Sequence, residues 1–334
     1  VLHTTEADGL FGGTYLDGQP LDSYLEANEQ PAYIVQNKKS GLTIDGERQR
    51  TLEPDGDFQA FALVTDLRVL FVVGQAGGDE SLALDLEDIV ETTAKTGLRT
   101  SKLTIESLDG EQWTFPCTDD PTAVATHVEE AAQVWANAAR LLDDVETGLG
   151  RAEDNRSRGD IDAARERVDD LAETIETALH RIQEVGPAAH ARIDSRAEEL
   201  RSWLTDLDRE LVAGDGARAH ARAQAAWQDS EYERAATAYD SAIEHYQTAL
   251  DTDGSTPDQE TLWSRLRASA AERELLRVGP IVDADTARRR ALALADPEDA
   301  AGEWERALEL YRDLLGLDWG HSDGEFVADH DRIR

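Results

Sequence analysis

The sequence predicts an α+β chain: a small antiparallel β-barrel or sandwich with a capping helix at its C-terminal end, followed by an all-α antiparallel helical array. Two observations predict this order. Before Pro121 apolar residues alternate with a period of two, and after it they recur every three or four residues. Turn dipeptides such as Asp45-Gly46 and Asp109-Gly110 separate short segments in the first part, whereas glycine and proline breaks separate long segments in the second.

The β part consists of short segments rich in β-branched and aromatic residues, and roughly seven strands are expected from it. Leu103, Ile105 and Ser107 alternate with Thr104 and Glu106, as in a strand with one buried face. The segments with strand composition are 32–36, 41–44, 58–65, 68–74, 81–86, 89–93, 102–107 and 112–116.

A helix is expected directly after these strands, from about Thr122 to Leu142. Asp119 or Asp120 can cap it, and Pro121 suits a first helical turn. An apolar stripe at helical spacing is formed by Val124, Val128, Ala131, Val134, Trp135 and Ala138. Such a helix can plug the open end of an antiparallel barrel.

The second part of the chain carries only helical patterns. Helices are expected at 161–182, 188–211, 217–229, 231–250, 259–278, 284–295 and 303–315. Breaks between them are expected at Gly186-Pro187, Gly214-Asp215-Gly216, 254–257, Gly279-Pro280 and Pro297. The expected organisation is therefore an N-terminal tail (1–20), a β domain with its helix (21–148), a polar link (151–159), a helical domain (160–317) and a C-terminal tail (318–334).

The helical domain contains an internal repeat. Tyr232-Glu233-Arg234-Ala235, followed by Tyr239, recurs as Trp304-Glu305-Arg306-Ala307, followed by Tyr311. A weaker copy surrounds Ala164, so that the three alanines, at 164, 235 and 307, lie 71 and 72 residues apart. A small residue between large ones at helical spacing lets a neighbouring helix approach closely.

Two resemblances follow from these patterns. The segment Ala62-Leu63-Val64-Thr65-Asp66-Leu67-Arg68-Val69-Leu70-Phe71-Val72 resembles a hairpin of bacterial and archaeal pleckstrin-homology-like and GRAM-like domains. The resemblance implies a turn at Thr65-Asp66, a strand led by Arg68, and Trp113 and Phe115 on the last strand before the helix. This superfold carries lipid, peptide and protein binders alike, so the hairpin indicates fold rather than function.

The order of small and large residues from Ala223 to Ile243 resembles the second helix of a tetratricopeptide repeat. The sequence departs from that family because its period is about 72 residues instead of 34. An ordinary antiparallel helical bundle or coiled coil remains the alternative.

Charge dominates the composition. There are 70 Asp and Glu residues against 33 Lys and Arg residues, which gives a net charge of −37. At molar ionic strength the Debye length falls to about 3 Å, so such repulsion is screened. The composition resembles that of haloarchaeal cytoplasmic proteins. A cytoplasmic location is expected, because the sequence shows neither a signal peptide nor an apolar stretch of membrane-spanning length.

One cluster of cations interrupts the acidity. Lys38, Lys39, Arg48 and Arg50 are candidates for binding an anion or a lipid headgroup, since the resemblance places similar residues in lipid-binding domains. The alternative is that they balance Glu47, Glu53 and Asp55. A further basic run, Arg288-Arg289-Arg290, is expected on a helix face near acidic neighbours.

No catalytic constellation, cofactor site or metal site is expected. The histidines are scattered without metal-ligand spacing, and Cys117, the single cysteine, is expected to be a small apolar residue at a strand end. Gly74-Gln75-Ala76-Gly77-Gly78 lacks the Gly-Lys-Ser/Thr ending of a phosphate loop. No small-molecule substrate is indicated.

The expected partner is another protein, which makes the chain a non-enzymatic interaction or adaptor module. Trp227, Tyr232, Trp263 and Trp304 are candidate contacts, with core packing as the alternative for each. Direct nucleic-acid binding is disfavoured by the net charge, and a membrane surface by the scarcity of lysine. Two other hypotheses stay open: a non-catalytic front of a nuclease or similar enzyme whose catalytic domain lies beyond Arg334, and headgroup binding by the β domain.

Overall fold

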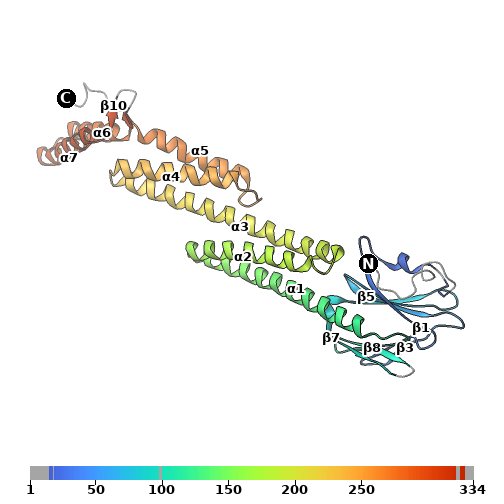
Figure 1. The fold of residues 1–334 in the computed structure, drawn as a ribbon. Coiled ribbons are helices and arrows are strands. Elements are labelled where there is room, and N and C mark those ends of the chain that lie inside the picture. Colours follow the sequence, from blue (N-terminus) through green and yellow to red (C-terminus); the bar gives the residue numbers. More distant parts are fainter. Residues whose placement is uncertain (1–14, 18, 98–99, 321–323, 328–334) are drawn as a thin grey trace. The chain divides into compact units, whose positions relative to one another are not determined.

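The computed structural model describes residues 15–17, 19–97, 100–320 and 324–327. The chain divides into two compact units. The first unit contains Val1–Arg151 and Asp169–Arg201, and the second contains Ala152–Val168 and Ser202–Arg334. Figure 1 shows strands at the N-terminal end of the chain and helices after them. No helix among the described residues combines the length and the apolar composition needed to cross a membrane.

The first unit is built on two antiparallel sheets. In the first sheet the order is β1 (Pro31–Asn37), β4 (Ala60–Thr65), β5 (Arg68–Val73) and β6 (Glu80–Asp85). In the second sheet the order is β3 (Arg50–Leu52), β2 (Leu42–Asp45), β9 (Gln112–Cys117), β8 (Ser101–Ser107) and β7 (Ile89–Lys95). Strands followed by helices confirm the predicted α+β class.

The hairpin of β4 and β5 is buried on both faces, which explains its nearly continuous apolar sequence. On one face Leu63 and Leu70 pack with Leu21 of a short 3-10 helix, Leu21–Tyr24. On the other face the ring of Phe71 lies 5.6 Å from that of Trp113, across to the second sheet. The first sheet is therefore covered on both faces, on one by the segment around Leu21 and on the other by the second sheet.

Helix α1 (Thr122–Ser157) follows β9 and is capped by Asp120, whose carboxylate accepts a 3.0 Å hydrogen bond from the Thr122 amide. It continues well past Leu142, so the polar link predicted over 151–159 is wrong for all but its last residues. The reason is packing: an added Cβ on Gly148 would lie 2.5 Å from Leu171 Cδ2. Gly148 allows a close helix approach and does not break the helix.

The remaining helices are α2 (Ile161–Ile182), α3 (Pro187–Gln228), α4 (Tyr232–Asp251), α5 (Gln259–Leu276), α6 (Gly279–Ala293) and α7 (Pro297–Gly316). The predicted break at Gly214-Asp215-Gly216 is wrong, because α3 runs through it. An added Cβ on Gly216 would lie 2.8 Å from the Tyr246 ring, and Asp215 forms ion pairs with Arg165 and Arg218. These residues serve helix packing.

In the second unit α4 packs on α5, and α6 packs on α7. The repeated alanines Ala164, Ala235 and Ala307 are all buried, as expected for small residues at helix contacts. The tetratricopeptide resemblance stays a prediction.

The segment predicted as a C-terminal tail contains two short strands, β10 (Trp319–Gly320) and β11 (Phe326–Val327), which pair in parallel. Phe326 is fully buried, and its ring lies 6.4 Å from that of Tyr232. Most of the predicted N-terminal tail (1–14 and 18) and residues 321–323 and 328–334 lie outside the described residues.

Candidate functional site

The predicted cation cluster lies on two exposed turns. Lys38 and Lys39 lie in the turn between β1 and β2, where the Asn37 side-chain oxygen accepts hydrogen bonds from the amides of Ser40 (3.1 Å) and Gly41 (2.8 Å). Arg48 lies in the turn at the other end of β2. At about 3.3 Å per residue, the strand separates the two turns by roughly 13 Å.

Arg50, which starts β3, forms an ion pair with Glu80 of β6. The acid that balances this arginine is therefore Glu80, and not Glu47, Glu53 or Asp55 as the alternative interpretation supposed. The four cations therefore lie on separate turns, and the charge of Arg50 is balanced by Glu80. A role of these four residues in anion binding stays a prediction.

The hairpin turn has the predicted shape and a structural role. Thr65 Oγ accepts hydrogen bonds of 3.1 Å from the amides of Leu67 and Arg68, which closes the turn. The Arg68 guanidinium donates to both carboxylate oxygens of Glu29 at 3.0 and 2.9 Å, and Thr65 Oγ donates to the same carboxylate at 2.7 Å.

The Glu29 side chain is fully buried beside this turn. Burial by itself raises the pKa of a carboxyl group, but the hydrogen bonds from Arg68, from the Glu26 amide and from Thr65 outweigh it, and the pKa of Glu29 is lowered. Glu29 is therefore held as a carboxylate, and it fixes the hairpin in place.

Asp66 joins the same hairpin to two helices. Its carboxylate accepts hydrogen bonds from the Gln30 amide (2.9 Å) and from the Ala188 amide in the first turn of α3 (2.8 Å). Its backbone oxygen accepts a 3.2 Å hydrogen bond from Trp135 Nε1 of α1. The motif that carries the pleckstrin-homology resemblance is thus occupied in holding the first unit together.

The four aromatic candidates differ in exposure. Tyr232 is 3% exposed and packs in the core, with its hydroxyl donating to Asp283 at 3.0 Å. Trp263 is 43% exposed, with the Arg267 guanidinium 5.8 Å from its ring centre, and Trp304 is 44% exposed on α7. Trp227 is half-buried at the end of α3 and lines a groove.

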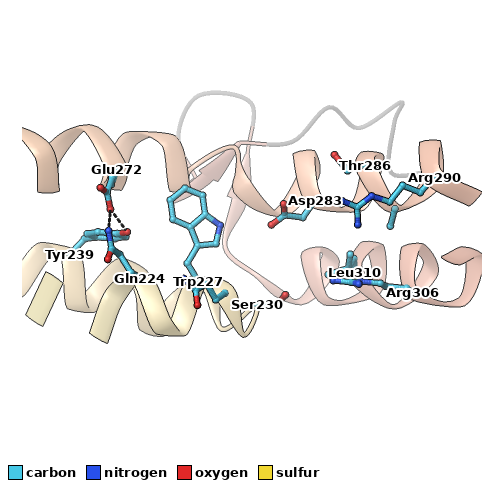
Figure 2. Close-up of a pocket in the computed structure, with 12 residues that line it drawn as sticks. Gln224, Trp227, Ser230, Tyr239, Glu272, Asp283, Thr286, Arg290, Arg306 and Leu310 are labelled. Atoms are coloured by element: carbon cyan, nitrogen blue, oxygen red, sulfur yellow. Dashed lines mark hydrogen bonds between the residues drawn. The ribbon is translucent and has the colours of Figure 1, made fainter. Parts of the chain in front are cut away.

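This groove, called here the Trp227 groove, has a volume of about 550 Å³ and lies within the second unit. Figure 2 shows its walls, formed by Gln224, Trp227, Ser230, Tyr239, Glu272, Asp283, Thr286, Arg290, Arg306 and Leu310. The Trp227 indole packs closely against the first residue of α6, since an added Cβ on Gly279 would lie 3.3 Å from Trp227 Nε1. The Trp227 and Tyr239 rings meet edge to face at 6.4 Å.

The two acidic side chains that line the groove, Glu272 and Asp283, accept hydrogen bonds from residues of the same unit. Glu272 accepts hydrogen bonds from the Tyr239 hydroxyl (2.7 Å) and from Gln224 Nε2 (3.0 Å), both drawn in Figure 2. His220 Nε2 lies 3.4 Å from the same carboxylate. Burial and the hydrogen bond to Glu272 raise the pKa of Tyr239, so its hydroxyl remains a donor. Asp283 is likewise occupied by the Tyr232 hydroxyl.

The two basic side chains that line the groove have no such partners among the described residues. Arg290 from α6 and Arg306 from α7 line the groove over Ala287 and Leu310, which belong to the core between these helices. Across residues 15–17, 19–97, 100–320 and 324–327, no carboxylate lies within ion-pair distance of either guanidinium. The groove therefore offers two unpaired cations beside an aromatic side chain, an arrangement suited to binding.

A second hollow, of about 560 Å³, is lined by Trp263 and Arg267. Among the described residues no three His, Cys, Asp or Glu side chains are grouped so that they could hold a metal ion. Cys117 is buried at the end of β9, and burial raises the pKa of its thiol to about 11. The sequence analysis pointed to Arg290 only as part of a basic run and missed Arg306. The internal repeat was the available signal, because it aligns Arg306 with Arg234.

No protein-family model and no curated protein matches this sequence. Several solved structures are similar to part of the chain, and two of them are pleckstrin homology domains. The N-terminal PH domain of Vps36 is 21% identical, covering 35% of this chain and 86% of that chain with a TM-score of 0.25. The pleckstrin homology domain of USP37 is 13% identical, covering 30% and 96% with a TM-score of 0.23. At such TM-scores, the pleckstrin-homology interpretation rests on the first unit's own sheets and hairpin.

Proposed function

We propose that this chain is a non-enzymatic protein-interaction module, and that its second unit takes a segment of a partner protein into the Trp227 groove. The observation that carries the proposal is the groove itself: a hollow of about 550 Å³ with a half-buried tryptophan and two unpaired arginines. Tryptophan and arginine are the side chains most enriched among residues that dominate binding energy at protein interfaces.

The first unit fits this role as a pleckstrin-homology-like domain. Its recognisable hairpin has its polar groups occupied internally by Glu29, Gln30, Trp135 and Ala188. The cations on its surface lie on separated turns. Partner recognition is therefore assigned to the second unit, which carries the groove.

The test is a quantitative capture experiment in molar salt, the condition that the acidic composition calls for. The chain is compared with the charge-reversal variant Arg290→Glu, Arg306→Glu and with the matched control Arg289→Glu, Arg312→Glu. Both variants change the charge equally and alter one residue on each of α6 and α7.

Proteins that the chain and the control retain equally, and that the groove variant loses, support the proposal. Equal retention by all three forms, or no reproducible retention by any of them, contradicts it.

A further inference from the structure

We infer that the Trp227 groove recognises an acidic peptide segment, whose carboxylates pair with Arg290 and Arg306 while an apolar side chain lies against Trp227. This inference rests on the proposed function and names the chemistry of the partner. A guanidinium presents a planar fork of donors that matches a carboxylate, and the fork keeps its geometric specificity where salt weakens plain charge attraction.

The two arginines differ from the other arginines of the second unit in that both line the Trp227 groove, and not in lacking an ion pair. Arg273 pairs with Asp240 and Glu325, and Arg156 with Glu210, but Arg222 and Arg289, like the two groove arginines, have no ion pair among the described residues. Arg290 of α6 and Arg306 of α7 both line the groove, and neither has a carboxylate partner among the described residues. A ligand with carboxylates would supply ion-pair partners for these two guanidinium groups.

The internal repeat gives an independent comparison. Arg234 in α4 and Arg306 in α7 occupy equivalent positions, and the acids three residues before them, Glu231 and Glu303, are equivalent too. In α4 the arginine forms an ion pair with Glu231. In α7 the described structure has no ion pair between Glu303 and Arg306, and the arginine lines the groove instead. The equivalent arginine and glutamate are therefore paired in α4 and unpaired with each other in α7.

The rest of the groove favours a peptide with carboxylates over other ligands. A cationic ligand would find Glu272 and Asp283 already engaged by tyrosine hydroxyls. The Trp227 ring offers an apolar surface.

The experiment uses the full chain and a short fluorescein-labelled peptide of glutamates around a central leucine. Its neutral control has glutamine in place of each glutamate. Fluorescence anisotropy in molar potassium chloride should show binding of the glutamate peptide at least about tenfold tighter than of the glutamine peptide. The variant Arg290→Glu, Arg306→Glu should lose that preference, and the control Arg289→Glu, Arg312→Glu should keep it.

A third variant, Arg290→Lys, Arg306→Lys, retains the charge but not the fork and should bind with intermediate affinity. Circular dichroism and the thermal midpoint of each variant establish that it is folded. Equal affinity for the two peptides, or full displacement of the glutamate peptide by millimolar inorganic phosphate, would overturn the inference. If partners captured from lysate depend on the groove while the glutamate peptide shows no preference, the proposed function survives and the acidic-peptide inference fails.

Discussion

The carboxylate of Asp66, in the turn between two strands, accepts a 2.8 Å hydrogen bond from the backbone amide of Ala188, 122 residues later in the chain. Ala188 lies in the first turn of α3, where amides lack partners within the helix and the helix dipole favours a negative charge. The Asp66 carboxylate therefore connects the turn of the β4–β5 hairpin to the N-terminal end of α3, within the first unit.

Replacing Asp66 with alanine is expected to destabilise the first unit by about 2 kcal/mol, because the amides of Gln30 and Ala188 both lose their acceptor. Urea denaturation measures the loss, and hydrogen exchange at the Ala188 amide locates it. Asp45→Ala, at an exposed strand end, serves as the control. The role given to Asp66 is wrong if both variants lose the same small amount.

Glu29→Gln is expected to cost about 3 kcal/mol at neutral pH, since it leaves Arg68 without its buried carboxylate. The pKa of Glu29 is lowered in the folded chain, so its contribution is present above its unfolded pKa of about 4.3 and is lost as the pH falls through the folded value. Wild-type stability should therefore fall toward the variant's below about pH 4. A constant difference between pH 7 and pH 3 would contradict this sign.

Gly214 and Gly216 test the continuity of α3. Gly214→Ala is expected to stabilise the chain by up to about 1 kcal/mol, because alanine is the better helix former and the nearest atom to its Cβ would be 3.9 Å away. Gly216→Ala is expected to destabilise it by about 1 kcal/mol, because its Cβ would lie 2.8 Å from the Tyr246 ring. Thermal denaturation of the two single variants gives both values. Stabilisation by both would mean that α3 does not approach α4 as described.

Lipid binding has its own test in liposome flotation with anionic vesicles in molar salt. Because the cation-bearing turns are separated and Arg50 is paired with Glu80, we expect no flotation of the chain. We expect the same of the variant with Ser at positions 38, 39, 48 and 50. Flotation of the wild type that the variant loses would restore the headgroup hypothesis.

The sequence predicted the elements whose patterns are local. The two-residue alternation of β8 corresponds to buried side chains, and so does the stripe from Val124 to Ala138 on α1 except at the half-buried Val134. The cap at Asp120 was also among the predicted alternatives. These features depend on neighbours within a few residues, so composition and spacing carry enough information.

Long-range contacts account for the errors. Gly148 and Gly216 resemble helix breakers in sequence, yet each faces a side chain of another helix, Leu171 or Tyr246, which decides its conformation. Phe326 was predicted to lie in a tail. It is buried against residues of α3, α4 and α5, which are distant in sequence, so no local pattern indicates its burial. The groove was missed for the same reason: Trp227 lies 63 residues before Arg290 (290 − 227), Arg306 lies on a further helix, and only packing brings the three together.

The most direct measurement is an NMR titration of the tryptophan indole N–H signals, assigned by single Trp→Phe variants, with the glutamate peptide in molar salt. The Trp227 signal should move and reach saturation, while those of Trp263 and Trp304, outside the groove, should stay in place. A stationary Trp227 signal, or equal movement of all three, would contradict the assignment of partner binding to the groove.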